Sequence, residues 1–155
     1  MDTATHTPQQ IADYVGTGMI ANDPATRGLG IELREISPGR AVMAMTVRAD
    51  MLNGFAICHG GFITTLADST FAFACNSYNQ LTVAAGIVVD FLAPAYVGEE
   101  LVAEALEVAR AGSTGVYDVT VRNSRGERVA VLRGRSHQMR GRNTVPVPVP
   151  VPGAP

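Results

Sequence analysis

Cysteine and histidine are scarce in this sequence, and neither is arranged as metal ligands are. The 155 residues include two cysteines and three histidines. Cys58 and Cys75 match no metal-ligand spacing, and the histidines are scattered, so the sequence predicts no metal site. Two cysteines without a secretory segment are typical of reduced thiols in a cytosolic protein.

Long apolar runs are absent, and so is an N-terminal targeting pattern. The longest apolar stretch covers only residues 83–89, which is far too short to cross a bilayer. Residues 1–7 contain neither the basic region nor the apolar region of a signal peptide. We therefore expect a soluble, cytoplasmic protein without a membrane partner.

The chain contains no lysine, and its twelve basic residues are all arginine. The net charge of −2 gives no indication of a nucleic-acid partner. Residues 110–142 nevertheless contain eight arginines and only two acidic residues, a surplus of six positive charges. Since guanidinium groups bind phosphate through paired hydrogen bonds, this segment is a candidate anion site. Arginines that merely occupy exposed strand faces are the alternative for most of the eight.

The composition is that of one globular domain. Hydrophobic residues make up 46% of the chain and charged residues 17%, which is too apolar for a disordered chain. We place the domain at residues 1–140. The remaining segment, residues 141–155, is rich in alternating valine and proline, and proline cannot donate to a regular hydrogen-bond ladder. It is predicted to be an extended polyproline tail.

The hydrophobic pattern predicts two helices and several strands. Thr7 and Gln10 have the spacing of a capping box, and the sequence Asn-Asp-Pro at 22–24 ends that first helix. Apolar residues recur at helical spacing over residues 60–77, so this second helix should be buried. Strands are predicted at residues 31–34, 41–47, 82–92, 99–110, 115–122 and 128–140. This order indicates an α+β fold, with one long buried helix packed on a curved antiparallel sheet.

The sequence His59-Gly60-Gly61 lies where an irregular loop becomes the buried helix. Glycines at a helix start let another molecule approach the free backbone N–H groups of the first turn. Together with the helix dipole, these groups suit a carbonyl oxygen that becomes negative during a reaction. A glycine-rich helix start without a chemical role is the alternative interpretation.

Asp68 lies two turns inside the same helix, among apolar neighbours. A carboxylate in such surroundings is costly to bury unless it is paired or has a function. No arginine lies near it in the sequence. Hydrogen bonds from Thr64, Thr65 or Ser69 are the structural alternative, and we favour a functional Asp68.

Six short motifs give the sequence a family resemblance. They are Met-Leu-Asn-Gly at 51–54, Cys-His-Gly-Gly at 58–61, Leu-Ala-Asp at 66–68, Phe-Ala-Phe-Ala-Cys-Asn-Ser at 71–77, Asp-Phe-Leu at 90–92 and Thr-Gly-Val-Tyr-Asp at 114–118. Together they resemble the phenylacetic-acid-degradation thioesterases of the hotdog-fold acyl-CoA thioesterase superfamily. The resemblance covers about residues 14–137, and the run over residues 51–77 is far more specific than His-Gly-Gly alone.

The resemblance implies a hotdog fold and the hydrolysis of aryl-acetyl-CoA thioesters to free acid and coenzyme A. It implies that the Gly60 amide polarises the thioester carbonyl, while Asp68 attacks it or activates a water molecule. His59 and Asn22 would help to order the site. No cofactor is implied, because coenzyme A is part of the substrate.

The resemblance also implies a set of substrate-binding residues. The turn at residues 112–114 would meet the coenzyme A pyrophosphate, and one of two arginines would contact its ribose phosphate. The full set is Asn53, Gly61, Gly112, Ser113, Thr114, Arg133 and Arg135.

Helix geometry limits how Gly60 and Asp68 meet. Eight residues separate them, so a single helix holds their Cα atoms ~12 Å apart, and the Asp68 side chain cannot close that gap. If both groups serve one carbonyl carbon, they must come from two subunits, as in a two-fold dimer with antiparallel helices. The resemblance implies that homodimer and its further pairing into a homotetramer.

Three other functions stay open at this point. An enoyl-thioester hydratase or dehydratase would use His59 with Asp68, although the Gly-Gly to Asp spacing favours hydrolysis. A nucleophilic Cys58 would need His59 or His137 as its base. A non-catalytic acyl-CoA-binding module would not need the carboxylate. Release of free thiol from acyl-CoAs would separate these functions from thioester hydrolysis.

Overall fold

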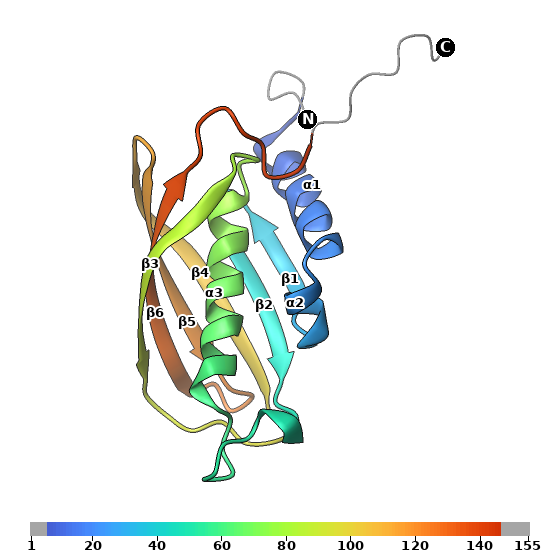
Figure 1. Ribbon diagram of the computed structural model, residues 1–155, viewed down its shortest axis with the longest axis vertical. Coiled ribbons are helices and arrows are strands. Elements are labelled where there is room, and N and C mark those ends of the chain that lie inside the picture. Colours follow the sequence, from blue (N-terminus) through green and yellow to red (C-terminus); the bar gives the residue numbers. More distant parts are fainter. Residues whose placement is uncertain (1–5, 147–155) are drawn as a thin grey trace, which may run out of the picture.

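Six antiparallel strands curve around helix α3 in the computed structural model, which describes residues 6–146 (Figure 1). The strand order in the sheet is β1-β2-β4-β5-β6-β3. The strands are β1 (Glu32–Ser37), β2 (Arg40–Thr46), β3 (Thr82–Phe91), β4 (Glu100–Ala111), β5 (Thr114–Arg122) and β6 (Arg128–Gln138). The helices are α1 (Pro8–Ala21), α2 (Pro24–Gly28), α3 (Gly60–Asn76) and the 3-10 turn η1 (Ala49–Met51). This arrangement confirms the predicted α+β fold.

The first two helices begin with side-chain caps. Thr7 Oγ1 accepts the Gln10 N–H at 3.2 Å, and the Gln10 side chain accepts the Thr7 N–H at 2.8 Å, so the predicted capping box is confirmed. α1 then packs beside β1 (Figure 1). Helix α2 was not predicted. Asp23 caps it by accepting the Thr26 N–H at 2.9 Å, so the Asn-Asp-Pro sequence ends one helix and starts the next.

Helix α3 lies against the concave face of the sheet and is buried along most of its length. The Phe71 ring packs on the ring of Tyr117, with the two centroids 5.5 Å apart. On β6, Gly134 leaves room for the Phe71 ring, because a Cβ at this position would lie 2.9 Å from it. This close packing fixes the axis of α3 and the position of every group it carries.

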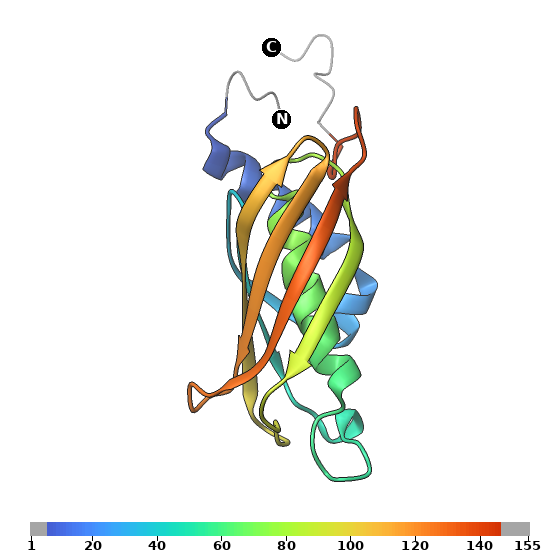
Figure 2. The ribbon, with the colours of Figure 1, turned by 90° about the vertical axis from the view of Figure 1, so that its left-hand side faces the viewer.

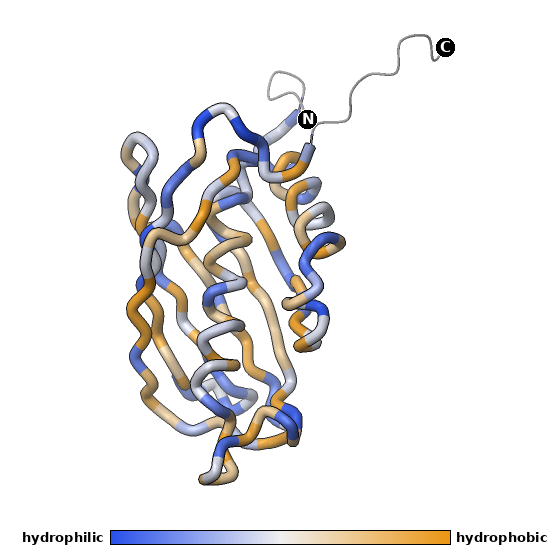
Figure 3. Tube along the Cα trace, viewed as in Figure 1, coloured by the Kyte–Doolittle hydropathy of each residue, from blue (hydrophilic) through white to orange (hydrophobic). Residues whose placement is uncertain are grey.

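Strand β3 forms one edge of the sheet, as the side view shows (Figure 2). Among the described strands it pairs with β6 alone. Val83, Ile87 and Val88 expose apolar side chains along it, and this hydrophobic run can be followed in Figure 3. An edge with free backbone groups and exposed apolar side chains is a surface that natural proteins normally cover.

The predicted strand boundaries agree with the structure to within about two residues, except that β1 continues to Ser37. The segment expected to be irregular, residues 48–58, contains η1 and an isolated bridge between Leu52 and Cys58. Most of the predicted polyproline tail lies outside the described residues. No helix within residues 6–146 is long and apolar enough to cross a membrane.

Candidate active site

The first turn of α3 presents a backbone N–H that the protein does not use. His59 is the N-cap, and its Nδ1 accepts the Gly61 N–H at 3.0 Å. The His59 carbonyl oxygen accepts the Phe62 N–H, also at 3.0 Å. Among the described residues, the Gly60 N–H has no acceptor. It is therefore a free donor at the positive end of the helix dipole.

The loop before α3 is held in place by backbone hydrogen bonds. The His59 N–H donates to the Met51 carbonyl oxygen and the Cys58 N–H to that of Ala95, both at 2.8 Å. Because Nδ1 of the His59 ring is an acceptor, the neutral ring carries its proton on Nε2. These contacts give His59 a structural task, which is to fix the start of the helix and occupy the neighbouring N–H of Gly61.

Phe91, the last residue of β3, fills the space beside Gly60. A Cβ added to Gly60 would lie 2.8 Å from Cζ of the Phe91 ring. A side chain at position 60 would therefore displace the Phe91 ring, which glycine leaves in place. This contact was not predicted, because Gly60 and Phe91 lie at the two ends of the segment that contains α3 and β3.

Asp68 is half-buried near the middle of α3. Thr64 and Thr65 each donate to the carbonyl oxygen four residues earlier in the helix at 2.8 Å, and the Ser69 hydroxyl lies 3.2 Å from that of Thr26. No hydrogen bond or ion pair reaches the Asp68 carboxylate from residues 6–146. The structural alternative, in which these hydroxyl groups satisfy Asp68, is not what the structure shows.

Burial raises the pKa of the Asp68 carboxyl above its ordinary value, because the ionised form loses solvation. No positive group offsets this effect in the described part of the chain. A carboxylate with a raised pKa and no structural partner is typical of a functional site.

The alternative nucleophile, Cys58, is buried, and burial raises the pKa of its thiol. Its Sγ lies 3.7 Å from the His59 carbonyl oxygen, and the His59 ring serves as a cap. The other candidate base, His137, is exposed on β6. A buried, protonated thiol is a poor nucleophile, so the structure argues against the Cys58 hypothesis.

Asn22 and Asn53 both have local structural tasks. The Asn22 side chain donates to the Gly18 carbonyl oxygen at 2.8 Å, at the end of α1. Asn53 Oδ1 accepts the N–H groups of Phe55 at 2.9 Å and Ile57 at 3.4 Å, which shapes the turn before α3. Within residues 6–146, no hydrogen bond joins either side chain to Gly60 or Asp68, and their predicted roles stay predictions.

The predicted coenzyme A turn at residues 112–114 lies at the other end of α3. It lines a small cavity together with Cys75, near the C-terminus of the helix. Gly60 begins the same helix, so one chain keeps this turn far from its own Gly60 amide. Residues 112–114 and Gly60 therefore belong to opposite ends of the subunit.

The two arginines predicted to contact coenzyme A differ in their surroundings. Arg133 makes two hydrogen bonds of 2.7 Å to the Asp118 carboxylate, and this guanidinium lowers the pKa of the Asp118 carboxyl. Arg135 extends over Gly86, where an added Cβ would lie 2.9 Å from its Nη2. Within residues 6–146 no acid pairs with Arg135. It is therefore the better candidate for a phosphate contact.

Other arginines of the basic segment are engaged locally. Arg125 pairs with Glu99 and Glu127. The Arg110 guanidinium lies over the Tyr78 ring, 3.9 Å from its centroid. Fewer arginines are consequently available to bind an anion than the charge surplus of residues 110–142 indicates.

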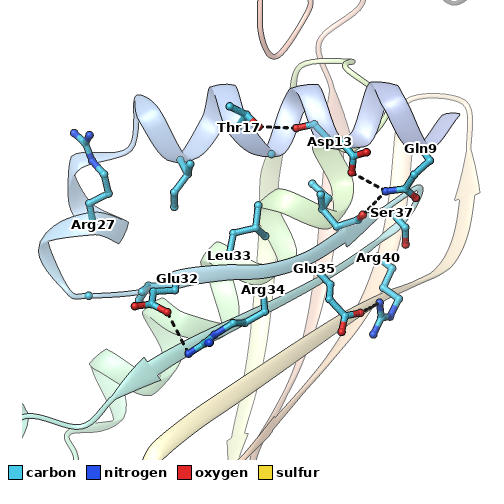
Figure 4. A pocket seen from close by; sticks show the side chains of 15 residues that line it. Gln9, Asp13, Thr17, Arg27, Glu32, Leu33, Arg34, Glu35, Ser37 and Arg40 are labelled. Atoms are coloured by element: carbon cyan, nitrogen blue, oxygen red, sulfur yellow. Dashed lines mark hydrogen bonds and ion pairs between the residues drawn. The ribbon is translucent and has the colours of Figure 1, made fainter. Parts of the chain in front are cut away.

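A groove of about 1100 Å³ runs between α1 and β1 (Figure 4). It contains neither Gly60 nor Asp68. Its polar groups largely pair with one another, as Glu35 does with Arg40 at 2.6 Å and Gln9 with Asp13 at 2.8 Å. Because the free N–H of Gly60 and the carboxylate of Asp68 both lie on α3 and outside this groove, we place the candidate active site at α3.

The chain shows clear similarity to known thioesterases. The family model of the thioesterase superfamily matches residues 55–130. The acyl-coenzyme A thioesterase PaaI of Escherichia coli strain K12 is 43% identical over 123 residues, which cover 79% of this chain and 88% of that protein. The chain belongs to the thioesterase superfamily.

Two further comparisons agree with this membership of the thioesterase superfamily. A putative esterase of Archaeoglobus fulgidus is 35% identical over 136 residues, which cover 88% of each protein. The solved structure of the E. coli PaaI protein matches with a TM-score of 0.86 at 40% identity, over 88% of this chain and 99% of that one. The hotdog fold implied by the sequence motifs is thereby confirmed.

The raised pKa of Asp68 leads to a prediction about stability. A folded-state pKa above the unfolded one means that the ionised carboxylate destabilises the folded state at neutral pH, and that this cost disappears as the pH falls through the folded pKa. We expect Asp68→Asn to be at least as stable as wild type at pH 7 and to lose any advantage near pH 4. Urea unfolding at both pH values measures this. A variant less stable at pH 7 would mean that the assembled protein pairs the carboxylate.

Proposed function

We propose that this protein is an acyl-CoA thioesterase that hydrolyses aryl-acetyl-CoA-type thioesters to the free acid and coenzyme A. The observation that carries the proposal is the combination of a free Gly60 N–H and an unpaired Asp68 carboxylate on one buried helix. Thioester hydrolysis needs a donor for the carbonyl oxygen and a nucleophile or base for the carbonyl carbon. The 43% identity to the E. coli acyl-coenzyme A thioesterase PaaI supports an acyl-CoA substrate. The E. coli PaaI protein comes from a phenylacetic acid degradation operon, which supports the choice of an aryl-acetyl group.

In this mechanism the Gly60 N–H donates to the thioester oxygen. As the carbonyl carbon is attacked, the oxygen gains negative charge, which the positive end of the α3 dipole stabilises. As a general base, ionised Asp68 takes a proton from the attacking water and returns it to the sulfur as the carbon–sulfur bond breaks, so coenzyme A leaves as the thiol. As a nucleophile, Asp68 attacks the carbon itself and coenzyme A leaves as the thiolate, which takes a proton from water. A water molecule then hydrolyses the mixed anhydride, which releases the acid and frees Asp68. No step uses a metal or a cofactor.

We further propose that the two groups come from different subunits of a homodimer. α3 is one unbroken helix from Gly60 to Asn76, so Gly60 and Asp68 of one chain stay ~12 Å apart along its axis. A two-fold axis near the middle of this interval would bring Gly60 of each chain to Asp68 of the other. The exposed apolar edge of β3 is a surface that such a dimer can cover.

The same dimer places the coenzyme A turn more favourably. Each site contains Gly60 from one subunit and Asp68 from the other. When the two α3 helices are antiparallel, the turn at residues 112–114 of the Asp68 subunit lies nearer to this Gly60 amide than the same turn of the Gly60 subunit does. We assign the pyrophosphate contact to this turn and the ribose-phosphate contact to Arg135. Pairing of dimers into a homotetramer is part of the proposal.

Asp68→Asn should lower thioester turnover by about 10²–10⁴-fold, because the amide can act neither as a nucleophile nor as a base. Release of free thiol from phenylacetyl-CoA measures the effect. Cys58→Ala is the matched control and should keep most of the activity, since the Cys58 thiol is buried. The wild-type rate should be unchanged by a chelator. A rate that a chelator abolishes and a divalent ion restores, or a dead Cys58→Ala, would contradict the mechanism.

Mixed dimers test whether the site is shared. One chain carries Asp68→Ala. The other carries Gly60→Pro, which removes the N–H, together with Phe91→Leu, which makes room for the added ring atoms. Proline suits the first helical position, and the extended His59 backbone before it (φ −63°, ψ 133°) tolerates a following proline.

Each of these variants alone should be nearly inactive. When they are co-expressed, half of the dimers are mixed, and one of the two sites in each has both groups intact. Thiol release should therefore return to about a quarter of the wild-type rate. Size measurements must first show that each variant dimerises. Mixed dimers that form and stay inactive would refute the shared site.

The two arginines offer a matched pair for the phosphate contact. Arg135→Ala should raise KM for phenylacetyl-CoA and leave KM for the 3′-dephospho analogue nearly unchanged, because a contact far from the reacting carbon is largely uniform binding. Arg133→Ala should show no such difference, since Arg133 is paired with Asp118. Equal effects of Arg135→Ala on both substrates would remove Arg135 from the phosphate site.

A further inference from the structure

Phe91 occupies an unusual position for an exposed aromatic residue. Its ring is in contact with Gly60, and 55% of the residue's surface is nevertheless exposed. The Cβ that Gly60 lacks would lie 2.8 Å from Cζ and 3.2 Å from each of the two Cε atoms. The tip of the ring therefore points at Gly60, and its two faces flank that contact.

From these observations we propose that Phe91 determines acyl-group specificity by presenting a ring face to the acyl group of the substrate. The inference rests on the proposed thioesterase function. It adds a residue on β3 to a site whose other groups lie on α3.

The ring is close to the reacting carbonyl. Within a residue, N and Cβ are about 2.5 Å apart, so Cζ of Phe91 lies at most roughly 5.3 Å from the Gly60 nitrogen. A carbonyl oxygen that accepts the Gly60 N–H lies ~2.9 Å from the same nitrogen. An acyl group that extends from the carbonyl carbon toward the end of β3 therefore reaches the ring.

The position of Phe91 is fixed from both sides. Its backbone pairs with Ala130 on β6, and the following N–H, of Leu92, donates to the Val129 carbonyl oxygen at 2.8 Å. The loop that leads into Gly60 is tied to the segment after β3 by the bond from Cys58 to Ala95. These bonds hold the backbone of Phe91, so every substrate meets the ring at the same place beside Gly60.

The Phe91 ring is chemically better suited to contact an aromatic acyl group than to contact the coenzyme A part of the substrate. The pantetheine arm is rich in amides, and the nucleotide is charged. An aryl group is apolar and gains from offset or edge-to-face packing on a phenylalanine ring. A small acyl group such as acetyl ends before it can cover the ring.

The test compares phenylacetyl-CoA with acetyl-CoA. In Phe91→Leu, the ratio of kcat/KM for phenylacetyl-CoA to kcat/KM for acetyl-CoA should fall about tenfold, which is the selectivity that a single apolar contact commonly provides. Leu92→Ala is the matched control, because Leu92 is the next residue and equally exposed, at 55%. Its ratio should equal that of wild type. If Phe91→Leu does not fold, Phe91→Met fills more of the same space and should give the same change.

A different result would overturn the inference. Equal losses on both substrates would mean that Phe91 only positions Gly60, and an unchanged ratio with unchanged rates would mean that the ring touches no acyl group. Either outcome leaves the thioesterase function intact, because wild type still releases thiol. Wild-type protein that releases no thiol from either substrate would instead overturn the proposed function, and this inference with it.

Discussion

The fixed span of α3 between Gly60 and Asp68 is the constraint on which the rest of the site depends. A helix cannot bring a residue two turns along back to its own first turn. The packing of Phe71 on Tyr117 and the cap at His59 hold α3 in place, so neither half of the site can move to meet the other. One subunit thus holds a donor and a carboxylate that it cannot use together. In the proposed homodimer, the second subunit supplies the geometry that the single chain lacks.

The start of α3 shows how a few residues can leave a single N–H free. A helix begins with several unpaired donors. The His59 ring occupies the Gly61 N–H, and the His59 carbonyl oxygen occupies the N–H of Phe62. Gly60 is left as a free donor, while the ring of Phe91 takes the place of its missing side chain. The donor is consequently both unused and fixed in position, which are the two conditions for stabilising charge that develops in a reaction.

Local sequence signals predicted the fold well, because the interactions behind them are themselves local. The capping box at Thr7 joins residues three apart, and the apolar periodicity over residues 60–77 defines α3 almost to its ends. The same signals identified the two halves of the candidate site. Helix α2 was missed because the Asn-Asp-Pro signal was interpreted only as a helix end, although Asp23 also caps a new helix.

Contacts between distant segments could not be predicted in this way. Nothing near Gly60 in the sequence indicates that the Phe91 ring lies against it. The charge surplus of residues 110–142 could not reveal that Arg133 is matched by Asp118 on the neighbouring strand. Nor could it reveal that Arg135 lies between Gly86 and Val116, neither of which is acidic. Pairing depends on strand register, which only the folded sheet defines.

Gly60 and Asp68 differ from the buried polar side chains of the protein in their hydrogen bonding. In the described part of the chain, every buried side-chain nitrogen or oxygen has a hydrogen-bond partner. A hydroxyl near Asp68 would have been enough to satisfy its carboxylate, and Thr64, Thr65 and Ser69 are all close in sequence, yet each is engaged elsewhere. Neither the Gly60 N–H nor the Asp68 carboxylate, which is only half-buried and so is not among those buried atoms, has a hydrogen-bond partner within residues 6–146. They are best explained by a ligand that accepts from the first and reacts with the second, which is the chemistry of a thioester.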